Sequence, residues 1–194
     1  IVNDLVNFKT SEHFNGFEYP KTPVITNDNS AVIQALQWGL IPQWAKDESI
    51  RQFTLNAKIE TLAEKPSFRN SVTKRCLVIA DGFYEWQWLD AKGKNKQKYL
   101  ITLPNDKLFA YAGIWSEWVS TISGEIIRTY SIVTTEASGI MREIHNSKKR
   151  MPVILTPNNE QQWLQSAPLN EFSIVNIELN ALKINPENSI GLLF

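Results

Sequence analysis

The sequence has a single cysteine, Cys76, among its 194 residues. One thiol excludes a disulfide within the chain and a metal site built from thiolates. Cys76 lies between Arg75 and the apolar run "LVIA", in a segment with the composition of a buried strand. Burial in apolar surroundings raises the pKa of a thiol and lowers its reactivity. We therefore expect Cys76 to be a structural residue rather than a nucleophile.

An excess of charge and long hydrophobic runs are also missing from the sequence. The 20 Lys and Arg residues balance the 20 Asp and Glu residues, so the chain lacks the overall basic character of many nucleic-acid binders. A local basic groove is still compatible with this balance, because it needs only a few charges in one place. No stretch approaches the roughly 20 apolar residues that span a bilayer, and no signal-peptide pattern opens the sequence. We expect a soluble, cytoplasmic protein without membrane contact.

No repeat or low-complexity segment divides the chain, so we expect a single domain over residues 1–194. Strand composition is found at residues 31–38, 75–88, 98–103, 107–115, 126–135 and 150–156. Gly82, inside the run 75–88, predicts a bend or bulge there. Helices are predicted at 66–72, at 136–145 and after the N-cap Thr156. This order predicts an α+β fold with a mainly antiparallel, curved or barrel-like β-sheet and a few short helices.

Alternating lysines mark the polar segment "DAKGKNKQK" between two predicted strands. They are Lys92, Lys94, Lys96 and Lys98. Charged side chains on an exposed strand edge discourage pairing between sheets. We interpret these lysines as a solvated edge and not as a DNA contact.

Polar side chains interrupt the strand pattern at three places. Glu85 lies within the aromatic run "GFYEWQW", where an ionised carboxylate is costly to bury unless it is paired or protonated. Asn56 and Lys58 occur in "NAKIE", and His145 and Arg150 occur in "IHNSKKRMP". A glutamate whose pKa is raised by an apolar setting can share acid–base work with a nearby histidine. Taken singly, Glu85 is also compatible with a strand edge, His145 with a helix end and Asn56 with a turn.

Seven segments occur in an order that resembles one protein family. They are "WGLIPQW", "LNAKIET", "PSF", "RCLVIADGFYEW", "YAGIW", "SIVTTEAS" and "IH…RMPVIL". Together they resemble the successive motifs of the SRAP family, the SOS-response-associated peptidases. The resemblance extends from about Trp38 to Trp163, and the residues outside this span add little to it.

The resemblance implies a sensor of abasic sites in single-stranded DNA that joins itself covalently to the lesion and associates with the nucleoid when DNA is damaged. In the family, the protein itself removes the initiator Met, and this removal exposes an N-terminal cysteine. The amine of that cysteine forms a Schiff base with the ring-opened sugar, and its thiol closes a thiazolidine ring. The sequence given begins with Ile1, which cannot do this chemistry. Because the other motifs are intact, we expect the cysteine in a segment that precedes Ile1.

The resemblance also assigns catalytic roles. Glu85 matches a glutamate that moves protons during imine formation and strand cleavage, and His145 matches a histidine that assists at the sugar hydroxyl. Asn56 matches an asparagine that positions the N-terminal residue and the sugar. No metal or organic cofactor and no obligate protein partner are implied.

Three further residues are implied to contact DNA. Lys58 stands where the family usually has arginine, which keeps the charge but loses bidentate geometry toward phosphate. Arg150 matches a second phosphate-binding arginine, although the segment "NSKK" makes its spacing from His145 longer than usual. Trp44 matches an aromatic that wedges against bases beside the lesion, and a core position is the alternative for it.

Two other functions remain open from the sequence. A DNA-binding module without catalysis is favoured if the natural protein lacks the N-terminal cysteine. A peptidase that acts on other proteins is the weakest alternative, because the sequence shows no partnered serine or cysteine nucleophile and no cluster of metal ligands.

Overall fold

The computed structural model describes residue 11 and residues 13–185. Short helices connect the strands: α1 (Met141–Ile144), α2 (Pro157–Leu164), and 3₁₀ turns at Gly16–Glu18, Glu48–Phe53, Ile59–Thr61, Arg69–Ser71, Pro104–Asp106 and Leu169–Phe172. The strands are β1 (Lys21–Thr26), β2 (Asn29–Trp38), β3 (Asn56–Lys58), β4 (Arg75–Ala80), β5 (Gly82–Trp88), β6 (Lys96–Thr102), β7 (Phe109–Val119), β8 (Ile126–Glu136), β9 (Arg150–Pro152), β10 (Ile154–Leu155) and β11 (Asn180–Ile184).

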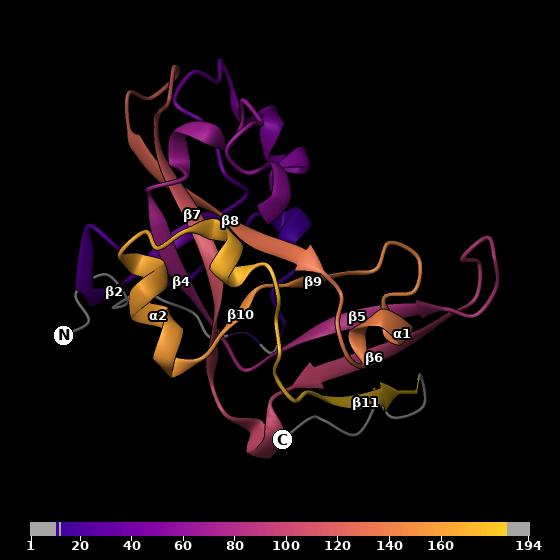
Figure 1. Cartoon of the computed structure of the whole chain (residues 1–194). Helices are drawn as coiled ribbons and strands as arrows, with labels where there is room; N and C mark the ends of the chain where they lie inside the picture. The colour runs from indigo at the N-terminus through magenta and orange to yellow at the C-terminus, as the bar shows by residue number, and fades with distance from the viewer. Residues whose placement is uncertain (1–10, 12, 186–194) are drawn as a thin grey trace.

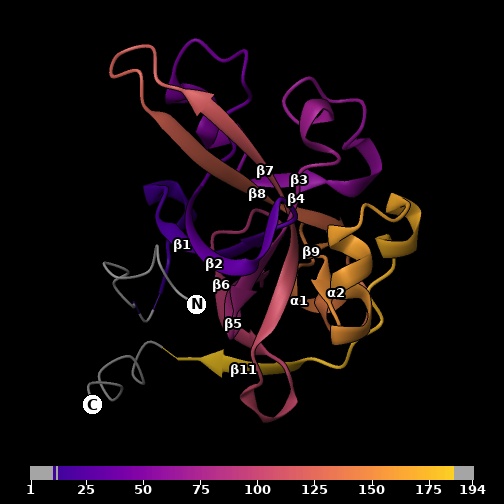
Figure 2. The ribbon, with the colours of Figure 1, turned by 90° about the vertical axis from the view of Figure 1, so that its left-hand side faces the viewer.

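The larger sheet closes into a barrel. Its strands follow the order β7, β4, β1, β2 and β8, and β8 then pairs antiparallel with β7. All of these pairings are antiparallel except that between β2 and β8. Strands β3 and β9 add to β8, and β10 adds to β7. β7 and β8 continue together beyond the rest of the barrel (Figures 1 and 2). The prediction of an α+β fold with a mainly antiparallel, barrel-like sheet is confirmed.

A smaller sheet, in the order β11-β6-β5, lies beside the barrel (Figure 1). The run 75–88 was expected to be one bent strand, and this is wrong, because β4 belongs to the barrel and β5 to the smaller sheet. The chain changes sheet at Asp81 and Gly82. A Cβ atom on Gly82 would lie 2.9 Å from the carbonyl oxygen of Ile101. Glycine at this position therefore allows two backbone segments to approach closely, and it does not form the expected bulge.

The interpretation of the alternating lysines as a strand edge is wrong for Lys96 and Lys98, whereas Lys92 and Lys94 lie exposed in the turn between β5 and β6. β6, which carries Lys96 and Lys98, is the central strand of the smaller sheet, between β5 and β11. Lys98 lies over the ring of Tyr84 and Lys96 over that of Trp88, at 3.7 Å and 5.5 Å from the ring centroids. The lysine ammonium groups therefore make cation–π contacts with aromatic rings across the strand pair.

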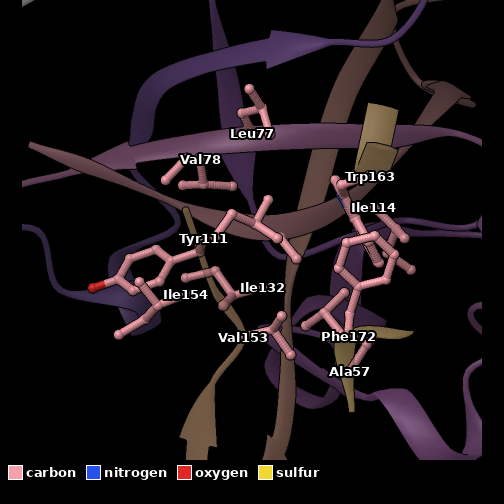
Figure 3. Packing of buried hydrophobic residues seen from close by; sticks show 14 of the residues in the cluster. Ala57, Leu77, Val78, Tyr111, Ile114, Ile132, Val153, Ile154, Trp163 and Phe172 are labelled. Atoms are coloured by element: carbon pink, nitrogen blue, oxygen red, sulfur yellow. The ribbon is translucent and has the colours of Figure 1, made fainter. Parts of the chain in front are cut away.

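The main hydrophobic core fills the barrel and extends under α2. Figure 3 shows Ile114 of β7 beside Trp163 of α2, and the rings of Trp163 and Phe172 meet edge to face with their centroids 5.0 Å apart. Trp163 is fully buried, and its Nε1–H lies 3.1 Å from the carbonyl oxygens of both Cys76 and Gly113. A buried indole needs such an acceptor, so the bonds fix α2 on the barrel wall.

The helices are shorter than the sequence predicts, apart from the last. Residues 66–72 contain only the 3₁₀ turn Arg69–Ser71, and 136–145 contain only α1. Glu136 still belongs to β8, and Gly139 has a φ of +49°, which delays the start of that helix. The helix after Thr156 is confirmed: Thr156 is the N-cap of α2, and its N–H donates to Oδ1 of Asn159 at 2.7 Å. No helix in residues 13–185 is long and apolar enough to cross a membrane.

Candidate active site

Glu85 lies near the middle of β5, with a side chain that is only 18% exposed. Burial raises the pKa of this carboxyl group above its ordinary value. The backbone N–H of Trp86, which donates to Oε1 at 2.9 Å, and the nearby charge of His145 partly oppose this rise. The N–H fixes one carboxylate oxygen, so Oε2 remains for a second partner.

That second partner is His145, which follows α1 directly. Its Nδ1 lies 3.3 Å from Oε2 of Glu85 and 2.7 Å from the backbone carbonyl oxygen of Arg150. A carbonyl oxygen only accepts hydrogen bonds, so the shorter contact requires a proton on Nδ1. In the neutral imidazole this leaves Nε2 as the nitrogen that can take up a proton. The structure thus brings Glu85 and His145 together and orients both groups.

Such a pair can both donate and accept protons. A carboxyl group with a raised pKa keeps its proton to higher pH than an exposed glutamate, and it can then act as an acid. After the proton has left, the adjacent imidazole stabilises the carboxylate. Two titratable groups within hydrogen-bonding reach, one of them perturbed by burial, form the arrangement expected of an acid–base site.

Asn56 and Lys58 lie at the two ends of β3, which pairs parallel with β8. Both are exposed, and both point to the same side of the strand, because the buried Ala57 lies between them. Among the described residues, the side chain of Asn56 makes no hydrogen bond with Glu85 or His145. The positioning role of Asn56 and the phosphate contact of Lys58 stay predictions.

Arg150 begins β9, and Glu60 holds its guanidinium group. Nη1 and Nη2 of Arg150 donate to Oε1 and Oε2 of Glu60 at 2.7 and 2.9 Å, and Nη2 also donates to the carbonyl oxygen of Thr134 at 2.7 Å. The hydrogen bond from Arg150 lowers the pKa of Glu60. A DNA phosphate would have to use the remaining donors or displace Glu60, so the phosphate contact of Arg150 stays a prediction.

Trp44 is 54% exposed, so the alternative of a core position is wrong. Its Nε1–H donates to the carbonyl oxygen of Pro66 at 3.2 Å, which anchors one edge of the indole. The exposed remainder of the ring is compatible with stacking on a base. The wedge role itself stays a prediction.

The family model described as "SOS response associated peptidase (SRAP)" matches residues 3–185 of the chain. The chain belongs to the SRAP family.

Similar proteins support this assignment. Over 142 residues, the chain is 46% identical to the abasic site processing protein YoqW of Bacillus subtilis (strain 168), covering 73% of the chain and 61% of YoqW. Over 165 residues, it is 35% identical to the abasic site processing protein HMCES of Gallus gallus, covering 73% of the chain and 47% of HMCES. The crystal structure of a protein from Bacteroides thetaiotaomicron matches with a TM-score of 0.82 and 35% identity, over 92% of this chain and 79% of the other. The aligned part therefore spans less than two thirds of YoqW and about half of HMCES.

In this SRAP chain Cys76 is a core residue. It is fully buried in β4, and burial raises the pKa of its thiol far above the ordinary value. A Cβ atom on Gly113 would lie 2.6 Å from its Sγ, so neighbouring strands pack tightly around the sulfur. The interpretation of Cys76 as structural is confirmed. No three His, Cys, Asp or Glu side chains in the described ranges lie close enough to hold a metal ion.

Sequence reasoning missed three polar residues that hold this site together. Glu60 was given no role, and its ion pair with Arg150 joins segments that are far apart in the chain. Gln87 and Asn146 tie β5 to the segment around α1. Gln87 lies two residues after Glu85 and Asn146 directly follows His145, and this proximity is the only signal that the sequence offered.

Proposed function

We propose that this chain processes abasic sites in single-stranded DNA by forming a covalent bond with the lesion. The reacting residue is a cysteine that precedes Ile1 and becomes N-terminal when the initiator Met is removed. The names of the relatives, abasic site processing proteins, support the substrate. The pairing of Glu85 with His145 supports the chemistry.

The reaction balances as two steps. The α-amine of the cysteine attacks the aldehyde carbon of the ring-opened sugar, and the resulting hydroxyl leaves as water to give an imine. The S–H bond of the same residue then adds across the C=N bond. Sulfur bonds to carbon, the nitrogen gains the proton, and a five-membered thiazolidine results. Both groups sit on one residue, so the ring closure is intramolecular and strongly favoured over attack by a separate thiol.

Glu85 and His145 supply the proton transfers. Protonated Glu85 donates to the departing hydroxyl, and its carboxylate accepts the proton that the amine loses. His145 stabilises the carboxylate and assists at the sugar hydroxyl through Nε2. If the imine instead loses a proton from the sugar C2′ atom, the bond to the 3′ phosphate breaks, which is the strand cleavage of a lyase. The same pair serves either outcome because both need proton transfer at the imine.

Groups outside the pair bind the DNA in this proposal. Lys58 and Arg150 contact phosphates, and Trp44 stacks on a base beside the lesion. Asn56 positions the sugar. The overall charge balance of the chain is compatible with a short, local binding surface of this kind.

The observation that carries the proposal is the 3.3 Å approach of His145 Nδ1 to Oε2 of the largely buried Glu85. The test uses protein produced from the complete reading frame and an oligonucleotide with one abasic site, analysed on a denaturing gel. A heat-stable adduct is expected, which Glu85→Gln slows and Asn158→Ala, an exposed substitution on α2, leaves unchanged. Binding of the oligonucleotide without any adduct would contradict the proposal and establish the alternative, a DNA-binding module without catalysis.

A further inference from the structure

Four residues, 146–149, connect His145 to Arg150, and backbone hydrogen bonds define their path. The N–H of Lys149 donates to the carbonyl oxygen of His145 at 2.8 Å, and the N–H of Ala137 donates to the carbonyl oxygen of Lys149 at 2.8 Å. Lys149 adopts a φ of 50°, in the left-handed region. The segment therefore forms a closed loop that returns the chain to Arg150 at the start of β9.

The side chain of Asn146, the first residue of this loop, makes the two backbone hydrogen bonds that a neighbouring strand would otherwise make. Its Oδ1 accepts from the backbone N–H of Trp88 at 3.0 Å, and its Nδ2 donates to the carbonyl oxygen of Trp88 at 2.8 Å. Among the described strands, β5 is an outer strand of the smaller sheet, so no described strand pairs with the backbone groups of Trp88 on its outer side. A carboxamide carries one acceptor and one donor group at the spacing needed to satisfy both.

Gln87 provides a second connection between the same elements. Its Nε2 donates to the carbonyl oxygen of Glu143, in the last turn of α1, at 3.1 Å. Its Oε1 accepts from the hydroxyl group of Tyr99 on β6 at 3.1 Å. Gln87 points to the same side of β5 as Glu85, because the two residues are separated by one position. The end of α1 and the start of the loop are thus tied to the strand that carries Glu85, and Figure 1 shows α1 beside the β5–β6 pair.

His145 lies between these two connections, one at Glu143 and the other at Asn146. We propose that Asn146 is a positioning residue, which fixes the imidazole of His145 against Glu85 by pairing its side-chain amide with the backbone of Trp88. Asn146 does not touch the reacting atoms and acts only through His145. In this proposal, the segment between His145 and Arg150 supplies the side chain that anchors the histidine.

The inference rests on the proposed function for its kinetic test and on the structure alone for its geometric test. In the kinetic test, Asn146→Ala in the full-length protein slows adduct formation about tenfold, because misplacing a catalytic group by a fraction of an ångström has effects of this order or larger. Affinity for an oligonucleotide with an unreactive abasic analogue stays within about twofold, since Asn146 does not contact DNA. Asn146→Asp keeps the acceptor for the Trp88 N–H and loses the donor, so its rate falls between those of Asn146→Ala and the wild type. Asn158→Ala again serves as the matched control.

A double-mutant comparison separates positioning from a general loss of structure. If Asn146 acts through His145, then Asn146→Ala causes no further loss in a His145→Gln background. The pH profile of Asn146→Ala likewise approaches that of His145→Gln. Equal fold losses in both backgrounds, or a wild-type rate for Asn146→Ala, would overturn the inference.

The geometric test does not depend on activity. Hydrogen exchange of the Trp88 backbone amide is slow in the wild type and fast in Asn146→Ala, and a crystal structure of the variant shows His145 Nδ1 displaced beyond the present 3.3 Å from Glu85. An unchanged separation in the variant would refute the positioning role even if the wild type forms adducts. A wild type that forms no adduct, with the expected exchange and displacement, would instead refute the proposed function and leave the anchoring role in place.

Discussion

Glu60 and Arg150 face each other through two parallel hydrogen bonds, of 2.7 Å between Nη1 and Oε1 and of 2.9 Å between Nη2 and Oε2. Asn56 and Lys58 lie on β3, and Glu60 follows in the next turn of the chain. The Glu60–Arg150 pair therefore connects this region to β9. The backbone carbonyl of the same Arg150 accepts from His145. Residues with implied roles in DNA binding and in catalysis are therefore joined through one arginine.

Arg150→Ala should weaken the salt dependence of single-stranded DNA binding. One lost phosphate contact reduces the slope of log K against log salt by about 0.7 for a single strand. Titrations at several salt concentrations measure this slope. The matched control is Arg142→Ala on α1, an exposed arginine paired with Glu136, which should leave the slope unchanged. An equal slope for Arg150→Ala and the wild type would show that Arg150 serves only its ion pair with Glu60.

The Glu60–Arg150 pair should make the protein sensitive to acid. The hydrogen bond from Arg150 lowers the pKa of Glu60 in the folded state below its ordinary value of 4.5. The ion pair therefore stabilises the folded protein fully above that ordinary pKa, and this stabilisation is lost as the pH falls through the lowered pKa. Between about pH 6 and about pH 3, the wild type should lose more thermal stability than Glu60→Gln, by about 1 kcal/mol or less because the carboxylate is partly exposed. Equal losses in the two proteins would mean that the pair contributes no pH-dependent stability.

Glu85→Gln should stabilise the protein at neutral pH while it slows the chemistry. Burial raises the pKa of Glu85 in the folded state above its value in the unfolded state. Protonated Glu85 therefore contributes its full share of the folding stability below the unfolded-state pKa, and this share is lost as the pH rises through the folded-state pKa. The amide has no such loss, and the melting temperature of the variant should rise relative to the wild type between about pH 4 and about pH 7. A variant that is less stable than the wild type at neutral pH would contradict the assigned direction.

Trp44→Ala should lower affinity for single-stranded DNA without lowering stability. The ring is 54% exposed, so little core packing is lost, whereas a stacked base contributes about 1–3 kcal/mol. Fluorescence anisotropy with a labelled oligonucleotide and thermal denaturation measure the two effects. Phe17→Ala removes an aromatic that is 72% exposed and carries no assigned role, so it should change neither quantity. If both variants bind equally well, Trp44 is not part of the DNA surface.

The sequence predicted the strand-rich architecture because its strand patterns are local. The places where it failed depend on pairings between distant segments. Gly82 was expected to bend one strand, but the close approach of Ile101, which local sequence does not reveal, makes it the point where the chain changes sheets. The lysines of β6 were assigned to an edge because nothing in their own segment shows that β11 pairs on the other side.

The candidate site was predictable in part. Glu85 and His145 interrupt the strand pattern, and the resemblance to the SRAP family implied their catalytic roles. The structure places them 3.3 Å apart. Their supporting residues were not predictable, because Glu60, Gln87 and Asn146 act through contacts that only the folded chain creates. A polar residue on a surface segment gives no sign of such a contact in sequence alone.

The central claim is that an N-terminal cysteine, assisted by Glu85 and His145, forms the bond to the abasic site. Peptide mapping by mass spectrometry, after the DNA of the adduct has been trimmed by nuclease, locates this bond directly. The expected result is the sugar remnant on the N-terminal peptide of the full-length protein, with unchanged yield in Cys76→Ser. A remnant on the peptide that contains Cys76, or on that of a lysine such as Lys58, would contradict the account.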